Sequence, residues 1–370
     1  MRLEVYHILV CSFITTMAQE TILVTGANGF IGLHVLHHCL KRDWNVIGTV
    51  RSEKGASLLQ SLFPEQTSSS QLKIAKIQGI TETEFYKPAF EGAGITAVIN
   101  TASPIIYNVS DVAKEILDPA ISSAIAILEA TALYGGHTVH RVVHVSSGAA
   151  FMDPSQGKGP GKHYTTEDWN PTTYEQAVAG GAGLAYMASK ALAERAMWKW
   201  KDEHPSTSFD LVSVAPAAVF GKQYLGALEG KQTVDLKGLN LSIMTIWAIA
   251  SPEAAKTTDT SFHMGGWVYV SDLAEALCKA VTTPEAGGLR IPCTQRCHWQ
   301  LIRDSARRVL PELRERIDPG EPGLAEREKE LTYAMDGSRM TSVLGVEYTS
   351  LDVALKEVYE QLLEAEKAQG

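Results

Sequence analysis

The sequence predicts an α/β protein built on a Rossmann-type, doubly wound parallel sheet, with a smaller C-terminal α/β lobe. Two observations predict this fold class. Short apolar segments rich in β-branched residues alternate with longer segments whose apolar residues recur at helical spacing, and a glycine-rich turn joins the first such strand to the first such helix. Strands and helices that alternate in this way form βαβ units and a parallel sheet.

The first strand, expected over residues 21–25, reads TILVT and ends at the glycine-rich turn. The first helix follows it, because Val35, Leu36 and Cys39 fall on one helical face. The remaining strands are expected at 45–50, 72–77, 97–100, 141–145 and 210–219, and the helices at 30–42, 111–134, 184–203, 236–250, 271–282, 299–310 and 351–367.

Residues 151–183 interrupt this alternation. They are rich in Gly and Pro, and they hold one aromatic island, Glu167-Asp168-Trp169-Asn170. A long loop inside a compact domain is more often functional than idle. We therefore expect this segment to border a binding site.

The composition excludes several classes of protein. Of 370 residues 45% are hydrophobic and 20% charged, as in ordinary globular proteins. A net charge of −9 without a dense Lys/Arg run argues against a nucleic-acid partner. Five cysteines predict reduced thiols and a cytoplasmic protein. No metal site is expected, because Cys293, Cys297 and His298 have no second ligand cluster at zinc spacing.

The N-terminal residues 1–17 fit either a weak signal-like segment or a start-site extension. Their apolar stretch is interrupted by polar residues, and Met17 begins a second plausible start just before the first strand. We favour the extension. Since no other run is expected to reach the length of a membrane span, no membrane partner is predicted.

The glycine-rich turn has the context of a dinucleotide-binding loop, since it follows a strand and opens a helix. Its glycines are spaced G-x-x-G-x-x-G. The first permits the tight turn, the second lets backbone amides approach a pyrophosphate, and the third allows close packing of helix on strand. The cofactor contacts expected here are Gly26, Asn28, Gly29, Phe30, Ile31 and Gly32.

The end of the second strand indicates which dinucleotide binds. An acidic residue at this place would contact the ribose 2′-hydroxyl of NAD. The sequence has Arg51 there, whose planar guanidinium suits a 2′-phosphate, and Lys54 follows as a second candidate. We therefore predict NADP(H).

Catalytic residues are predicted on the fifth strand and on the helix 184–203. Tyr186 and Lys190 are four residues apart and share a helix face, so that the lysine cation brings the pKa of the tyrosine nearer neutrality for proton transfer to a carbonyl oxygen. Ser147 follows the fifth strand at the carboxyl edge of the sheet, where ligands bind. Its hydroxyl could polarise a substrate carbonyl, and Ser146 is the alternative.

The glycine loop, the Tyr/Lys pair and this serine together resemble the extended short-chain dehydrogenase/reductases, and in particular the branch of plant dihydroflavonol reductases and fungal methylglyoxal/aldehyde reductases. Further segments carry the resemblance from Ala18 to about Glu366. They are TGANGFIG, VRS, TASP, VSSGAA, EDWNP, YMASK, PAAVFG and the tail 344–363.

The resemblance implies a role for each matching residue. Tyr186 resembles the general acid, Lys190 its partner and Ser147 the hydroxyl that orients the carbonyl. The further cofactor contacts that it implies are Thr101 and Ala102 beside the ribose, Pro216 and Val219 at the carboxamide, Ser242 at a phosphate, and Gly79-Ile80 in place of the Asp-Ile that the family often sets against adenine.

The leading hypothesis is an NADPH-dependent carbonyl reductase that acts on a ketone or aldehyde, as a monomer or homodimer. Apolar and aromatic side chains predicted near the pocket suggest an apolar or aromatic substrate, and the resemblance suggests a fungal secondary-metabolite intermediate. The alternatives are a sugar-nucleotide epimerase/dehydratase of the same superfamily and a non-catalytic NADP-binding sensor. The side chains behind the substrate prediction are Ile105, Ile106, Tyr107, Trp169 and Tyr224.

These expectations divide the chain into three parts. Residues 1–17 are the extension or signal-like segment. Residues 18–221 form the NADP-binding Rossmann domain, which includes the catalytic Ser, Tyr and Lys. Residues 222–370 form mainly the substrate-binding lobe, with some segments returning to the Rossmann domain.

Overall fold

The computed structural model describes residues 19–104, 109–251 and 265–369. The predictions for residues 1–17, and those for Ile105, Ile106 and Tyr107, lie outside the described residues.

A seven-stranded sheet forms the centre of the molecule, and every neighbouring pair of its strands is parallel. The strand order is β10-β7-β5-β4-β1-β2-β3, which confirms the predicted Rossmann-type fold. The direction of winding reverses between β1 and β4, and a crevice for ligands opens at such a switch point. The strands are β1 (Thr21–Thr25), β2 (Asn45–Val50), β3 (Leu72–Lys76), β4 (Ala97–Asn100), β5 (Arg141–Val145), β7 (Asp210–Pro216) and β10 (Arg290–Cys293).

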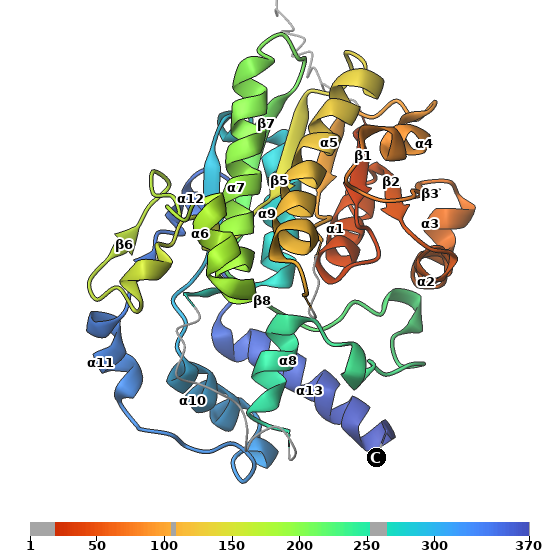
Figure 1. Ribbon diagram of the computed structural model, residues 1–370. Helices are drawn as coiled ribbons and strands as arrows, with labels where there is room; N and C mark the ends of the chain where they lie inside the picture. The colour runs from red at the N-terminus through yellow and green to blue at the C-terminus, as the bar shows by residue number, and fades with distance from the viewer. Residues whose placement is uncertain (1–18, 105–108, 252–264, 370) are drawn as a thin grey trace, which may run out of the picture.

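Helices cover both faces of this sheet (Figure 1). On one face α1 (Phe30–Leu40) packs against α9 (Val270–Thr282), and on the other α5 (Asp118–Tyr134) packs against α7 (Gly181–Glu203). Strands buried on both faces read as continuous apolar runs rather than as alternating ones. The fully buried run Ile22, Leu23 and Val24 in β1 is an example.

A second, smaller core lies below the sheet in Figure 1. The parallel pair β8 (Ala218–Phe220) and β9 (Trp267–Tyr269) contributes to it, together with α8 (Leu241–Ala248), α10 (Trp299–Val309) and α13 (Leu351–Gln369). Large side chains fill this core. They include Phe220, Trp247, Trp267, Trp299 and Tyr359.

Several elements differ from the sequence prediction. The strand expected over 210–219 is divided, because the chain leaves the main sheet after Pro216 and joins the small sheet as β8. Residues 151–183 are more ordered than a loop, since β6 (His163–Tyr164) pairs with β11 (Ala334–Met335) and α6 (Tyr174–Ala179) has a capping box. Elements that the sequence reading missed include β10, α2 (Glu53–Leu62), α3 (Pro64–Ser68), α4 (Lys87–Phe90), α11 (Leu324–Leu331) and α12 (Ser338–Ser342).

One helix corrects the expectation that no further run could span a membrane. The helical stretch Ala113–Tyr134 consists of a π-helical turn followed by α5. With 22 residues and a mean hydropathy of 1.5, it is long and apolar enough to cross a membrane. Half of its most apolar window is buried in the protein, where α5 packs on α7. Core packing therefore accounts for its apolar character.

Candidate active site

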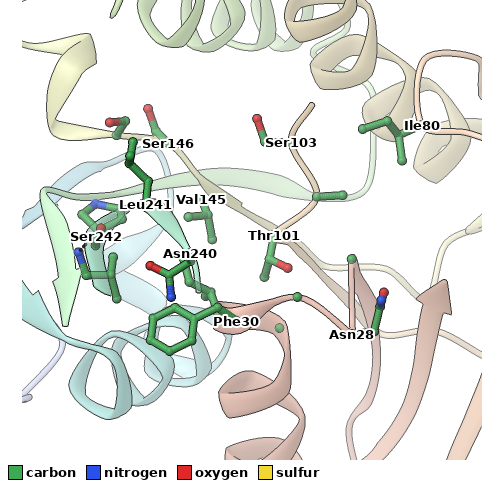
Figure 2. A pocket seen from close by; sticks show the side chains of 18 of the residues that line it. Asn28, Phe30, Ile80, Thr101, Ser103, Val145, Ser146, Asn240, Leu241 and Ser242 are labelled. Carbon is green, nitrogen blue, oxygen red and sulfur yellow. Dashed lines mark hydrogen bonds between the residues drawn. The ribbon is translucent and has the colours of Figure 1, made fainter. Parts of the chain in front are cut away.

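A cavity of about 440 Å³ lies at the carboxyl edge of the main sheet, at the switch point between β1 and β4. Figure 2 shows Asn240, Leu241 and Ser242 at one side of it and Asn28 and Ile80 at the other. Nearly all the predicted site residues line it, although they come from distant segments of the chain. They are Gly26, Asn28, Gly29, Phe30, Ile31, Gly32, Arg51, Ile80, Thr101, Ala102, Ser147, Tyr186, Lys190, Pro216, Val219 and Ser242.

The glycine turn is held tightly beneath this cavity. Gly26 has a φ of +64°, and a Cβ there would lie 3.1 Å from the Cα of Ala102. A Cβ on Gly32 would lie 2.3 Å from the carbonyl oxygen of Gly26. Only glycine fits at these two positions. The backbone can therefore approach a ligand where the N-terminus of α1 faces the cavity.

Two predicted cofactor contacts lie outside the cavity lining. The first is Lys54, which is exposed and lies in α2, whereas Arg51, also exposed, does line the cavity. The second is Gly79. Local packing rather than the cofactor explains the glycine there, since a Cβ would lie 2.9 Å from the ring of Phe85. Its neighbour Ile80 does line the cavity.

Tyr186 and Lys190 lie one turn apart on α7, as the spacing predicts. The Nζ of Lys190 lies 5.3 Å from the centroid of the Tyr186 ring and donates a hydrogen bond to the Oγ of Ser103 at 2.8 Å. Burial lowers the pKa of Lys190 to about 8, so the group is mostly charged at neutral pH and titrates just above it. Tyr186 is 39% exposed, which leaves its ring accessible from the cavity.

The structure distinguishes the two candidate serines. Ser146 is buried, and its hydroxyl donates to the Oε2 of Glu194 at 2.5 Å. Ser147 is half-buried, and its Oγ accepts a hydrogen bond from the amide of Ala149 at 3.2 Å. Its hydroxyl proton can therefore point toward a ligand, whereas that of Ser146 is held by Glu194.

Asn240 is a site residue that the sequence reading missed. Its Oδ1 accepts from the amide of Ile243 at 3.1 Å and so caps α8, which is a common role for asparagine. Its Nδ2 is buried and has no hydrogen-bond partner among the described residues. A buried donor without a partner is costly, and this one lines the cavity, so a ligand acceptor would satisfy it. The residues present thus fit an anionic dinucleotide.

The cysteines form no ligand cluster in the part of the chain that the structure describes, where no group of three or more His, Cys, Asp or Glu side chains could hold a metal ion. Cys39, Cys278, Cys293 and Cys297 are free and buried. His298 caps α10 instead, because its Nδ1 accepts from the amide of Gln300.

The amino-acid sequence is similar to those of known enzymes. The sequence model of the NAD dependent epimerase/dehydratase family matches residues 22–291. The chain belongs to this family. Within the family, it is 30% identical to the NADPH-dependent methylglyoxal reductase of Saccharomyces cerevisiae, over 94% of this chain and 99% of that protein. It is also 30% identical to the ketoreductase azaE of Aspergillus niger, over 93% of this chain and 98% of that protein.

The solved structures of this family agree with the sequence relatives. The crystal structure of yeast methylglyoxal/isovaleraldehyde reductase complexed with NADPH superimposes with a TM-score of 0.84 at 29% identity, over 94% of this chain and 99% of that chain. The chain is therefore similar to NADPH-dependent carbonyl reductases along nearly its whole length, as the resemblance in its sequence implied.

Proposed function

We propose that this protein is an NADPH-dependent carbonyl reductase that converts an aldehyde or ketone to an alcohol. One observation carries the proposal: a single cavity brings the glycine turn and Arg51 together with Ser147, Tyr186 and Lys190. Dinucleotide binding and proton transfer can therefore take place side by side. Two relatives that align over nearly their whole length are an NADPH-dependent methylglyoxal reductase and a ketoreductase.

Each catalytic side chain has a role in this reaction. NADPH, when bound, supplies the hydride for the carbonyl carbon. The Tyr186 hydroxyl gives its proton to the carbonyl oxygen as negative charge develops there. Ser147 donates a hydrogen bond to the same oxygen. The charged Lys190 favours ionisation of Tyr186, which makes that proton transfer easier.

The cofactor site is proposed from charge and hydrogen-bonding capacity. Arg51 would hold the 2′-phosphate with its planar guanidinium. The N-termini of α1 and α8 both face the cavity, and Asn240 and Ser242 stand at the second of them. The residues at these two helix ends would bind the pyrophosphate of the cofactor.

Fewer of the predicted apolar and aromatic side chains line the cavity than the sequence indicated. Trp169 stacks on Arg290 with a distance of 3.5 Å between guanidinium carbon and ring centroid, and Tyr224 stacks on Phe63. Neither lines the cavity. Among the described residues, Leu241 supports an apolar substrate, since it lines the cavity and is 49% exposed. We keep the proposal to a small carbonyl compound.

Two observations favour the reductase over the alternatives. A sugar-nucleotide epimerase or dehydratase must bind a nucleoside diphosphate, but Lys222 is paired with Glu229 at 3.0 Å and Arg290 is buried against Glu194. A non-catalytic sensor has no need of the Tyr186–Lys190 pair.

The experiment is a panel assay that follows loss of NADPH absorbance with aldehydes, diketones and aryl ketones, beside a panel of UDP-sugars. Turnover of a carbonyl compound with formation of the alcohol is the expected result. Conversion of a UDP-sugar without net NADPH consumption would replace the proposal with the epimerase. NADPH binding without any turnover would favour the sensor.

A further inference from the structure

A buried ion pair lies directly behind the catalytic side chains, outside the lining of the cavity. Arg290 begins β10 and is 8% exposed, and Glu194 on α7 is 1% exposed. The Nε of Arg290 donates to the Oε1 of Glu194 at 2.7 Å. Charges so deeply buried are costly unless hydrogen bonds satisfy them. Their other contacts show what this pair holds in place.

Arg290 clamps the segment that follows Ser147. Its guanidinium carbon lies 3.8 Å from the ring centroid of Phe151 and 3.5 Å from that of Trp169, between the two rings. Its Nη1 donates to the carbonyl oxygens of Thr166 and Asp168, at 2.9 Å and 2.8 Å. The planar guanidinium uses both its faces and its edge, which a lysine could not do.

Glu194 connects the two catalytic elements. It lies one turn after Lys190 and two turns after Tyr186 on α7. Its Oε2 accepts the hydroxyl proton of Ser146, the residue before Ser147. Burial alone would raise the pKa of Glu194, but attraction and hydrogen bonds from Arg290 and the hydrogen bond from Ser146 outweigh it and lower the pKa. Glu194 therefore stays ionised and accepts from both sides.

We propose that Glu194 and Arg290 are positioning residues that fix the distance between Ser147 and the Tyr186–Lys190 pair. This inference rests on the proposed function. The three hydrogen-bonded parts are the end of β5, helix α7 and the 151–170 segment, and each carries or borders a catalytic group. A displacement of about 1 Å can cost on the order of a hundredfold in rate, so such a connection matters for the chemistry as well as for folding.

The chain offers a matched control at the other end of the same strand. Arg141 begins β5 and is 5% exposed, whereas the site lies at the end of β5. It pairs with Asp210 and donates to the carbonyl oxygens of Ala280 and Thr283, at 2.6 Å and 2.8 Å. Removal of Arg141 therefore disturbs a comparable buried arginine without touching the active site.

The test compares Arg290→Met, Arg290→Lys and Glu194→Gln with Arg141→Met in the full chain. NADPH titration gives the Kd and the concentration of binding sites, and carbonyl turnover is expressed per binding site. We expect kcat per site to fall at least about tenfold in Arg290→Met and Glu194→Gln, with Kd within about twofold. In Arg290→Lys, kcat per site should fall less. The deuterium isotope effect on kcat with deuterated NADPH should rise, because hydride transfer becomes slower.

Arg141→Met should keep kcat per site and the isotope effect of the parent chain, even if its yield falls. The inference is overturned if Arg290→Lys and Glu194→Gln keep parental kcat per site, or if Arg141→Met loses as much as they do. If Arg290→Met does not fold, Arg290→Lys and Glu194→Gln still test the inference. A parent chain that binds NADPH but reduces no carbonyl compound would overturn the proposed function, and this inference with it.

Discussion

The ammonium nitrogen of Lys190 lies 5.3 Å from the ring centroid of Tyr186 and donates a hydrogen bond to the Oγ of Ser103. This lysine thus contacts both the loop after β4 and the proposed acid. Because burial already lowers its pKa to about 8, its charge is lost at mildly alkaline pH. The pair therefore gives the proposed reaction a defined pH dependence.

The first prediction concerns that dependence. Lys190 is charged below its pKa of about 8 and neutral above it, so kcat/KM for reduction should be high at neutral pH and fall as pH rises through about 8. Arginine stays charged throughout this range, so the decline should move to higher pH in Lys190→Arg. A pH profile of kcat/KM in both proteins checks this. A flat parental profile across the alkaline range would contradict it.

The second prediction concerns cofactor choice. Arg51→Asp replaces a cation at the cavity with an anion and should weaken NADPH binding about ten- to a hundredfold, while NADH binding changes little, because a charge-assisted hydrogen bond is worth roughly 1.5–3 kcal/mol. Lys54→Asp is the matched control, since Lys54 is also exposed but lies outside the lining. Titration with both cofactors measures the ratio. Equal effects of the two substitutions would remove Arg51 from the site.

The third prediction concerns the Nδ2 of Asn240. Asn240→Asp keeps the cap of α8 but places a carboxylate beside the proposed phosphate site, so NADPH affinity should fall at least about tenfold. Asn240→Ser also keeps a capping oxygen and removes only the donor, so NADPH affinity should fall less in this variant. The Kd values are measured by titration, with thermal unfolding as the check on the cap. Unchanged Kd values in both would show that this amide does not contact the cofactor.

The fourth prediction separates the two serines. Ser147→Ala should lower kcat on the order of a hundredfold, since it removes a donor to the developing oxyanion. Ser146→Ala should lower it less, because that hydroxyl is bound to Glu194 rather than to substrate. Steady-state kinetics on both variants gives the comparison, and the reverse order would exchange the two roles.

The sequence predicted those parts of the site that depend on local spacing. The glycine turn, Tyr186 and Lys190 are set by one turn or one helix, and local geometry places them wherever the fold forms. The main strands β1, β2, β4 and β5 were likewise predictable, because their apolar runs are buried on both faces.

The sequence did not predict what depends on contacts between distant segments. Glu194 and Arg290 are 96 residues apart, and nothing in their neighbours marks them as a pair. Asn240 reads as an ordinary helix cap until its second side-chain atom is found without a partner. The short strand β10 was missed because Pro292 argues against a strand within the main sheet.

The most direct test of Tyr186 as the proton donor is the rate of carbonyl reduction by Tyr186→Phe, with its NADPH Kd measured in the same preparation. The substitution removes one hydroxyl from a residue that is 39% exposed and should leave the fold intact. We expect a loss of kcat on the order of a hundred- to ten-thousandfold, with Kd within about twofold. Reduction at the parental rate would contradict the assignment of Tyr186 as the proton donor.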